Sequence, residues 1–426
     1  MKVLWFVNGM LPEFSVALGR KAGNTGGWMP SLTGAIRQYA PKIELYVVCE
    51  ADGDYQRDAN GTHYYGFKNF NHGLRWGRSS KCAFVGKVKS LIQNVNPDLI
   101  HFHGTENGYA DLGDEVWRGV PRVVTLQGII NGIYPHYMGG LTPLQLKPYQ
   151  NHLRNLITGK NLLDTADLWR MRLAIAEARS LNKMQHVAGR TDWDRAWAKA
   201  LAPHARYHYV GEIMRPEFYE RDNRSRVMPH RIYASAAFKY PLKAGHVLLQ
   251  ALSYLKGAYP DVKLAVADGL DKLRPTSLRA KLSQTEYHRC LSACIQELGL
   301  EDNVELLPPI DSARVRDELE KAEVYCQASF VENSPNSLAE AQLVGVPVVA
   351  SYAGGIPSMV KNGKTGLLVQ PSDPAVLAAA IARLFDDDDM KARLADMAWK
   401  IANERHNPQK VVADLTTCYG KVIGNA

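Results

Sequence analysis

Short β-rich runs alternate with helical patterns along the whole chain, and no other feature restricts the possible folds as strongly. In the first half the runs cover residues 3–7, 43–48, 99–102, 122–126, 186–188 and 206–210, with helical patterns such as 86–95 between them. The alternation begins again with runs at 231–236, 262–267, 304–307, 324–327, 346–350 and 367–369. Alternating strands and helices are typical of parallel sheets with helices on both faces. The sequence therefore predicts an α/β protein with two facing Rossmann-like, doubly wound domains.

Length and linker composition divide the chain. It has 426 residues, more than the roughly 250–300 at which one core stops growing. Residues 214–229 are polar, interrupted by proline and without helical periodicity, which is typical of a linker. We expect a first domain at 1–213, a linker at 214–229 and a second domain at 230–407, with a final helix at about 408–426 packing back on the first. Doubly wound sheets bind ligands at the carboxyl ends of their strands, so the site is expected in an inter-domain cleft.

The charge is distributed unequally. Residues 1–210 have 25 Lys and Arg against 16 Asp and Glu, whereas the remainder has a net charge of −1. No acidic residue lies between Asp58 and Asp98. This interval contains six basic residues, Lys68, Arg75, Arg78, Lys81, Lys87 and Lys89, interleaved with aromatic residues that include Phe67, Phe70, Trp76 and Phe84. Such a mixture favours an anionic surface such as phospholipid headgroups. The alternative is a solvated face whose aromatic side chains belong to the core.

Two absences in the sequence bear on localisation. No stretch approaches the ~18 apolar residues of a membrane span, and the apolar run at residues 1–7 is too short for a secretion signal. The six cysteines are scattered without a C-x-x-C spacing, which indicates neither a disulfide framework nor a zinc site. We therefore expect a cytoplasmic protein, attached peripherally to the inner face of the plasma membrane.

The strongest motif is the pair Glu332 and Glu340, separated by seven residues. It follows the β-rich run 324–327 and opens a helix, with Pro335 in the first turn and Ser334 or Asn333 as the cap. Backbone N–H groups at a helix start suit a phosphate. Two glutamates at this spacing occur often by chance, but the strand–cap–helix context makes the pattern specific. The two carboxylates can hold opposite ends of one elongated ligand.

The run from Glu332 through Gly354-Gly355-Ile356-Pro357 to Asn362-Gly-Lys-Thr-Gly366 resembles the donor-binding half of family 4 glycosyltransferases, of the bacterial polysaccharide type. The resemblance covers nearly the whole chain and is most specific at residues 324–371. It implies the GT-B arrangement of two Rossmann-like domains. It also implies retaining, metal-independent transfer of a hexosyl group from a nucleotide diphosphate donor, such as a UDP- or GDP-sugar, without a cofactor.

The resemblance also implies roles for individual residues. Glu332 holds hydroxyls of the transferred sugar, Glu340 holds the ribose, and the base rests near Pro309 and Ile310. The backbone between the two glutamates lines the sugar and the diphosphate, at Asn333, Ser334, Pro335, Asn336, Ser337 and Leu338.

Lys243 lies at the start of a helix in the segment Tyr240-Pro-Leu-Lys243 and can neutralise the leaving diphosphate. The alternative for this lysine alone is a solvated residue at a helix start. The family usually has an arginine six residues earlier and a glycine directly afterwards, where this chain has Ala237 and Ala244. Lys239 can take the place of the missing arginine.

A glycine turn, Asn24-Thr-Gly26-Gly27-Trp28, follows the first β-rich run. Gly26 and Gly27 permit positive φ and close backbone approach, which a phosphate-binding turn requires. A double glycine alone is only a loop, but in the family the equivalent turn closes over the donor diphosphate.

Candidate contacts to the sugar or the acceptor follow three other β-rich runs: His103, Glu106, Gln127 and Arg190. Gln127 stands where many family members have a histidine that contacts the sugar, so this role does not transfer directly. A lone histidine such as His103 is more often structural.

Together these residues predict a glycosyltransferase that works mainly by stabilising the departing diphosphate, with Lys243, the helix start at 334–337 and the glycine turn. The acceptor is expected to be a glycan or a lipid-linked molecule of cell-surface polysaccharide synthesis, with no nucleic-acid partner. A nucleotide-sugar 2-epimerase and a non-catalytic glycan- or membrane-binding protein are the alternatives. Asp52-Gly-Asp54 spells a metal-binding D-x-D motif but reads as a turn, so no metal site is expected.

Overall fold

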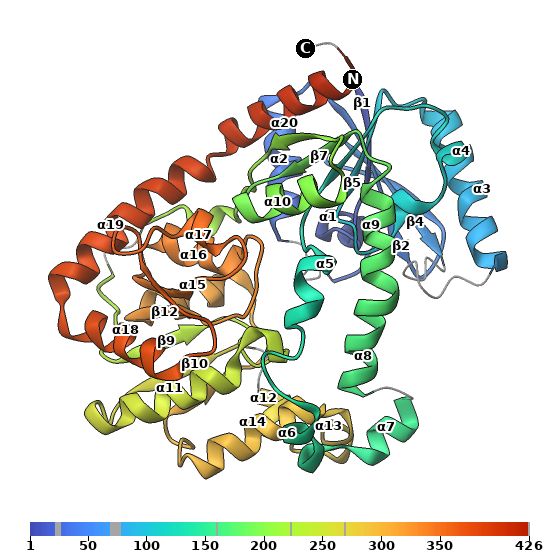
Figure 1. Ribbon diagram of the computed structural model, residues 1–426. Helices are drawn as coiled ribbons and strands as arrows, with labels where there is room; N and C mark the ends of the chain where they lie inside the picture. The colour runs from blue at the N-terminus through green and yellow to red at the C-terminus, as the bar shows by residue number, and fades with distance from the viewer. Residues whose placement is uncertain (22–26, 69–77, 159–160, 222–223, 268–269, 425–426) are drawn as a thin grey trace. The chain divides into compact units, whose positions relative to one another are not determined.

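The computed structural model describes residues 1–21, 27–68, 78–158, 161–221, 224–267 and 270–424, and it divides into two compact units (Figure 1). The first unit comprises Met1–Asn131, Arg170–Arg215 and Arg405–Ala426. The second unit comprises Gly132–Trp169 and Pro216–Glu404. Each unit is built around its own sheet.

The first sheet has eight strands in the order β3-β4-β2-β1-β5-β6-β7-β8. Their bounds are β1 (Lys2–Phe6), β2 (Glu44–Ala51), β3 (Tyr55–Ala59), β4 (Thr62–Lys68), β5 (Leu99–His103), β6 (Arg122–Thr125), β7 (His186–Gly189) and β8 (Arg206–Tyr209). All neighbours are parallel except β3 and β4, which form an antiparallel hairpin. The hairpin turns at Asn60 and Gly61, which both have positive φ. Asn-Gly is a strong hairpin signal that the sequence analysis missed.

Helices cover the first sheet. Their bounds are α1 (Pro12–Ala17), α2 (Trp28–Tyr39), α3 (Arg78–Val95), α4 (Asp114–Trp117), α9 (Ala174–Leu181), α10 (Asp192–Leu201) and α20 (Pro408–Val422), and α5 (Ile130–Ile133) begins in this unit. In α3 the buried residues Val88, Leu91, Ile92 and Val95 follow helical spacing and pack into the core of this unit. The C-terminal helix α20 contacts α2, and Trp5 Nε1 donates a hydrogen bond of 2.8 Å to the hydroxyl of Tyr419.

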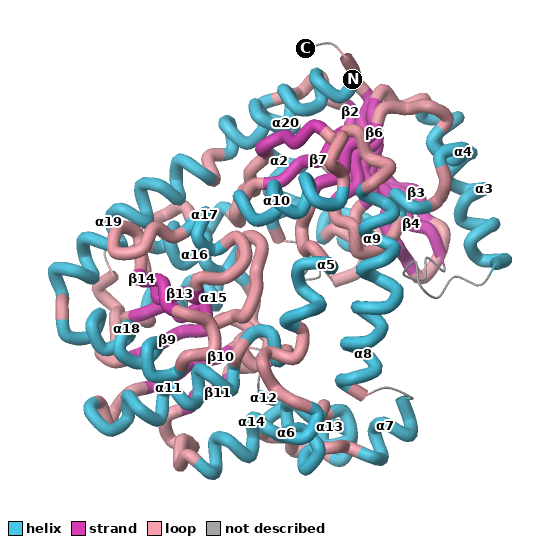
Figure 2. The backbone as a smooth tube through the Cα atoms, in the orientation of Figure 1, coloured by secondary structure: helices cyan, strands magenta, loops and turns pink. Residues whose placement is uncertain are grey.

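The second sheet has six strands, all parallel, in the order β11-β10-β9-β12-β13-β14 (Figure 2, magenta). Their bounds are β9 (Arg231–Ala234), β10 (Lys263–Val266), β11 (Val304–Leu306), β12 (Val324–Gln327), β13 (Val348–Ser351) and β14 (Leu367–Val369). Every residue of β9, β12 and β13 is buried, as expected for parallel strands with helices on both faces. The predicted fold class, two Rossmann-like α/β domains, is confirmed.

The helices of the second unit are α6 (Pro143–Leu146), α7 (His152–Thr158), α8 (Leu162–Leu168), α11 (Gly245–Ala258), α12 (Leu270–Leu273), α13 (Leu278–Ser283), α14 (Glu286–Glu297), α15 (Ser312–Lys321), α16 (Asn336–Val344), α17 (Ile356–Met359), α18 (Pro374–Asp386) and α19 (Asp388–Arg405), which reaches the unit boundary. The helices α11 and α18 contact each other, and their buried residues belong to the same core.

The segment 132–169 differs from the division expected from the sequence, which places it within a domain at 1–213. In the structure it packs on the second unit, where Tyr137, Leu146 and Leu162 join the core. Asn151 Nδ2 donates to the carbonyl oxygens of Lys281 and Gln284, at 3.3 and 3.1 Å. These contacts join residues about 130 positions apart in the chain, and local composition carries no signal of such pairing.

Candidate functional site

A carboxylate network occupies the carboxyl end of β12. Glu332 Oε1 accepts hydrogen bonds from Ser329 Oγ at 2.9 Å and from Gln327 Nε2 at 3.3 Å, and it forms an ion pair with Lys243 Nζ. Ser329 and Gln327 are buried, whereas the side chains of Lys243 and Glu332 remain 26% and 14% exposed. The structure therefore brings together the two residues that the sequence predicted to be catalytic, and it leaves both accessible to a ligand.

The network continues into the first turn of α16. The hydroxyl of Tyr325 donates to Gln327 Oε1 at 2.7 Å and lies 2.8 Å from Ser337 Oγ. Burial raises the pKa of Tyr325 well above its ordinary value, so its hydroxyl stays protonated. Tyr325, Gln327 and Ser329 were missed by the sequence analysis. For Tyr325 and Gln327 a signal was available, since polar side chains two residues apart in a strand point to one face.

The start of α16 differs in one detail from the prediction. Pro335 itself is the N-cap, with extended backbone, and no side chain caps the helix. The prediction that Ser334 or Asn333 caps it is therefore wrong, and Ser334 Oγ instead donates to Met359 Sδ at 3.6 Å. Without a side-chain cap, the first N–H groups of the helix stay available to an anion.

Deeper in α16, the side chains of Leu338 and Glu340 are buried. Glu340 is 6% exposed, and it lies on the same helix as Ser337, which joins the network of Glu332. The structure therefore places both glutamates of the motif in the second unit, one before the helix and one within it.

Two glycines hold the backbone of Glu332 in place. The N–H of Gly355 donates to the carbonyl oxygen of Glu332 at 2.7 Å. Gly354 has φ +54°, and a Cβ at this position would lie 2.1 Å from the same oxygen. Only glycine fits here, because a side chain would meet backbone that cannot move without displacing Glu332.

Ala244 adopts a left-handed conformation with φ +61° and is fully buried. It stands directly after Lys243, where the family usually has glycine, and its φ explains that preference. Lys239, the predicted substitute for the missing arginine, is exposed, and its ammonium lies 5.6 Å from the centroid of the Tyr240 ring. Ala237, which stands where the family usually has the arginine, is buried and has no charged group to offer a ligand.

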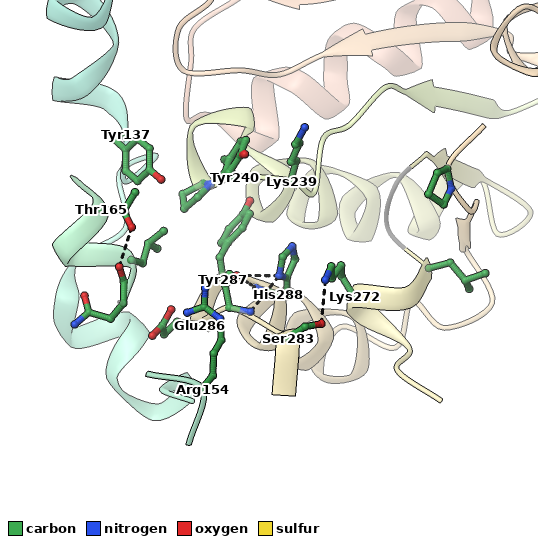
Figure 3. A pocket seen from close by; sticks show the side chains of 16 residues that line it. Tyr137, Arg154, Thr165, Lys239, Tyr240, Lys272, Ser283, Glu286, Tyr287 and His288 are labelled. Carbon is green, nitrogen blue, oxygen red and sulfur yellow. Dashed lines mark hydrogen bonds between the residues drawn. The ribbon is translucent and has the colours of Figure 1, made fainter. Parts of the chain in front are cut away.

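A pocket of about 460 Å³ lies within the second unit, beside Lys239 (Figure 3). Its polar lining includes the cations Arg154 and Lys272 and one carboxylate, Glu286. The other lining residues are Tyr137, Asn161, Leu162, Thr165, Tyr240, Pro241, Leu270, Ser283, Thr285, Tyr287, His288 and Pro309. Ile310, the predicted base contact, follows Pro309 and is half-buried.

The charges in this pocket are incompletely compensated. Lys272 Nζ donates to Ser283 Oγ at 2.9 Å, and within the described residues no carboxylate pairs with it. Glu286 is 3% exposed; its Oε1 accepts from Asn155 Nδ2 at 2.9 Å, while Oε2 has no hydrogen-bond partner in the described part of the chain. Burial lowers the pKa of His288 to about 4, so this residue is neutral at pH 7. The pocket therefore suits a ligand that has both negative charge and a hydrogen-bond donor.

In the first unit, His103 is buried at the end of β5, between His101 and Trp5, whose ring centroids lie 3.8 and 4.4 Å away. Neither of its ring nitrogens has a hydrogen-bond partner among the described residues. Burial, together with the nearby His101 and Arg190, holds the pKa of His103 well below its ordinary value. His101 differs, because Tyr419 and Thr125 satisfy both of its nitrogens.

The other predicted contacts of this unit are partly used in its own structure. Glu106 accepts from Asn8 Nδ2 at 3.0 Å and from the N–H of Gly128 at 2.9 Å, and burial raises its pKa. Arg190 forms an ion pair with Glu212 at 2.6 Å and donates to the carbonyl oxygen of Leu126 at 3.0 Å. Glu212 is 3% exposed and was missed by the sequence analysis. Gln127 lies half-buried beside Leu126.

The glycine turn is only partly described, because Gly26 lies outside the described residues. Gly27 has φ −53° and is the N-cap of α2, so the positive φ that glycine permits is not adopted at this position. Close approach does occur there, since a Cβ on Gly27 would lie 2.9 Å from Arg215 Cδ.

The D-x-D motif lies in the turn between β2 and β3. Asp52 pairs with Arg20 at 2.9 Å, and Asp54 pairs with Lys87 at 2.8 Å. In the described ranges, no three His, Cys, Asp or Glu side chains gather as metal ligands would. None of the helices in the described part of the chain combines the length and the apolar character needed to cross a membrane.

Comparison with known proteins identifies relatives. The family model described as glycosyl transferases group 1 matches residues 217–400. A D-inositol 3-phosphate glycosyltransferase from Corynebacterium efficiens is 30% identical over 74% of this chain and 70% of its own. The same kind of enzyme from Corynebacterium urealyticum is 35% identical, over 37% of this chain and 35% of its own length. The matched part of this chain thus spans about a third of the length of some relatives and most of the length of others.

Solved structures share the fold at low sequence identity. Sucrose-phosphate synthase from Thermosynechococcus elongatus has a TM-score of 0.72 at 16% identity, over the full length of both chains. HepE from Anabaena, in complex with UDP and glucose, has a TM-score of 0.64 at 18% identity, over 98% of each chain. At these identities the likeness concerns the fold.

Proposed function

We propose that this chain, which belongs to the group 1 glycosyl transferases, moves a hexosyl group from a nucleotide diphosphate sugar to a glycan or lipid-linked acceptor. We propose further that transfer retains the anomeric configuration, needs no metal or other cofactor, and serves cell-surface polysaccharide synthesis. The observation that carries this proposal is the network of Lys243, Glu332, Ser329 and Gln327 at the end of β12.

The network suits the departure of a diphosphate. The bond between the anomeric carbon and the phosphate oxygen breaks, and the acceptor oxygen bonds to the same face of that carbon. The Lys243 ammonium and the first N–H groups of α16 stabilise the charge that develops on the departing phosphate. Glu332 accepts hydrogen bonds from sugar hydroxyls, and the departing phosphate takes the proton of the acceptor hydroxyl. Fixed donors of this kind act without a metal ion.

We assign the nucleoside end of the donor to the pocket beside Lys239. This pocket lies within the same unit as Lys243 and includes Pro309, near which the family places the base. Lys272 and Arg154 offer positive charge, and Glu286 Oε2 can accept from a ribose hydroxyl or a base N–H. Its volume of about 460 Å³ is within the usual range of small-molecule sites.

Lys272→Ala is expected to weaken the binding of a nucleoside diphosphate by about tenfold, since a hydrogen bond to a charged group contributes roughly 1.5–3 kcal/mol. Isothermal titration with UDP and with GDP measures this. Lys400→Ala removes an exposed lysine of the same unit and serves as the control. Equal affinities of the Lys272→Ala and Lys400→Ala variants would show that the nucleoside diphosphate does not bind in this pocket.

Chelation with EDTA is expected to leave the transfer rate unchanged, because the proposed charge stabilisation comes from Lys243 and backbone N–H groups. Release of nucleoside diphosphate from a verified donor, measured with and without EDTA, tests this. A loss of activity that Mg²⁺ or Mn²⁺ restores would contradict it.

A donor panel tests the proposal as a whole. Purified chain is incubated with UDP- and GDP-sugars, with and without glycan acceptors, and products are followed by mass spectrometry and NMR. Formation of an α-glycoside from an α-linked donor supports retaining transfer. An epimer formed without any acceptor would instead indicate a 2-epimerase.

The proposed lipid-linked acceptor bears on where the protein works. We propose that the chain works in the cytoplasm, attached to the inner face of the plasma membrane, where a lipid-linked acceptor meets soluble nucleotide sugars. The acid-free interval 59–97 supports this through its charge. Arg75 and the side chains of Arg78 and Lys81 lie outside the described residues, so their support comes from the sequence alone.

A further inference from the structure

Exposed leucines are concentrated in one region of the second unit. Among the large hydrophobic side chains that the structure describes as exposed, all five leucines lie at residues 144–163 or at 278. The most exposed are Leu144 at 76%, Leu153 at 53%, Leu156 at 82% and Leu278 at 73%. Single exposed apolar residues are ordinary, but a group of leucines indicates a surface that contacts another molecule.

These leucines belong to helices at one edge of the second unit, where α6 contacts α14 and α7 contacts α13. In Figure 1, α6, α7 and α13 lie close together at this lower edge. Asn151 bonds to the end of α13, and Asn155 bonds to Glu286 at the start of α14. On α7, Leu153 and Leu156 are three residues apart and therefore share a face. The asparagines anchor the helix, and the leucines point to solvent.

The same segments are basic and lack carboxylates. No Asp or Glu occurs at residues 132–163 or at 272–285. Lys147, Arg274, Arg279 and Lys281 are exposed, and no described carboxylate pairs with any of them. Exposed leucines among unpaired cations are complementary to an anionic bilayer, where apolar side chains enter the acyl boundary and cations meet the headgroups.

We propose that α6, α7 and α13 form a leucine surface, comprising Leu144, Leu153, Leu156 and Leu278, that docks on an anionic lipid bilayer. This surface lies in the second unit and is separate in sequence from the basic interval 59–97 of the first unit. The inference rests on the proposed membrane location but requires neither a donor nor an acceptor.

Sedimentation with vesicles tests the proposal on the full chain. The probes are vesicles of phosphatidylcholine alone and of phosphatidylcholine with phosphatidylglycerol, at low and high salt. We expect binding to the anionic vesicles at low salt. The triple variant Leu153→Ser, Leu156→Ser, Leu278→Ser should bind them at least about tenfold more weakly, since each buried leucine contributes substantially to partitioning. Arg279→Ser with Lys281→Ser should also weaken binding and reduce its salt dependence.

Two comparison variants make the outcome specific. Val376→Ser with Met397→Ser changes apolar residues of the same unit that are 45% and 44% exposed, and it should bind like the unmodified chain. Arg75→Ser with Arg78→Ser and Lys81→Ser tests the basic interval independently.

Unchanged vesicle binding by the leucine variant, with thermal unfolding like that of the unmodified chain, would overturn the leucine surface. So would a loss of self-association, seen by light scattering, without any effect on lipid binding, because the leucines would then contact a second copy. Retained transfer to a water-soluble acceptor in the leucine variant would show that the proposed function stands even where the docking surface fails.

Discussion

Lys243→Ala is expected to lower the transfer rate by about 10²–10³, because one fixed donor to a developing negative charge typically contributes roughly 3–4 kcal/mol. Glu332→Ala should lower the rate by at least about tenfold. The substitution removes the carboxylate that accepts from the sugar hydroxyls, and it leaves Lys243 without its ion-pair partner. Release of nucleoside diphosphate under saturating donor measures both. Because the two side chains contact each other, their effects should not add, and the double variant should be little worse than Lys243→Ala.

The control for these variants is Lys400→Ala, which removes an exposed lysine of the same unit and should keep the full rate. Thermal unfolding separates a chemical loss from a folding defect. Near-normal rates for both Lys243→Ala and Glu332→Ala, with a verified donor, would refute their assignment to the site. Additive losses in the double variant would show that they act independently, despite the ion pair.

The candidate site could be predicted from the sequence wherever its residues are close along the chain. Glu332 and Glu340 belong to one helix and the residues before it, so a local pattern reveals them. Their supporting network was harder to find, since Tyr325 and Gln327 lie in a short buried strand and Ser329 lies two residues beyond its end. The direct pairing of Lys243 with Glu332 joins residues 89 positions apart, and no local pattern predicts it.

The same difference between local patterns and long-range contacts explains which parts of the fold could be predicted. The strands that pair only in parallel were all predicted, because most of them are short apolar runs of the kind found where helices cover both faces of a sheet. The hairpin of β3 and β4 was missed because β3 is largely exposed and polar, with the sequence Tyr-Gln-Arg-Asp-Ala. The association of 132–169 with the second unit depends on side-chain bonds such as those of Asn151. A segment of ordinary composition gives no sign of which sheet it will join.

Gly354→Ala is expected to destabilise the second unit and to lower the transfer rate strongly. Alanine in the left-handed conformation costs about 1–2 kcal/mol, and the clash with the Glu332 carbonyl oxygen forces a backbone shift that costs about 1–3 kcal/mol more. The shift moves Glu332 itself, so the rate should fall even at temperatures where the variant remains folded.

Gly363→Ala is the matched control for Gly354→Ala. Gly363 also has positive φ, +71°, but a Cβ there would have no neighbour within 4 Å. Gly363→Ala therefore has the cost of the left-handed conformation but no clash. It should lower the melting temperature slightly and leave the transfer rate unchanged. Thermal unfolding and donor turnover of the two variants measure the difference. If both variants unfolded at the same temperature and turned over donor equally, the close contact of Gly354 with Glu332 would have no role in positioning the carboxylate.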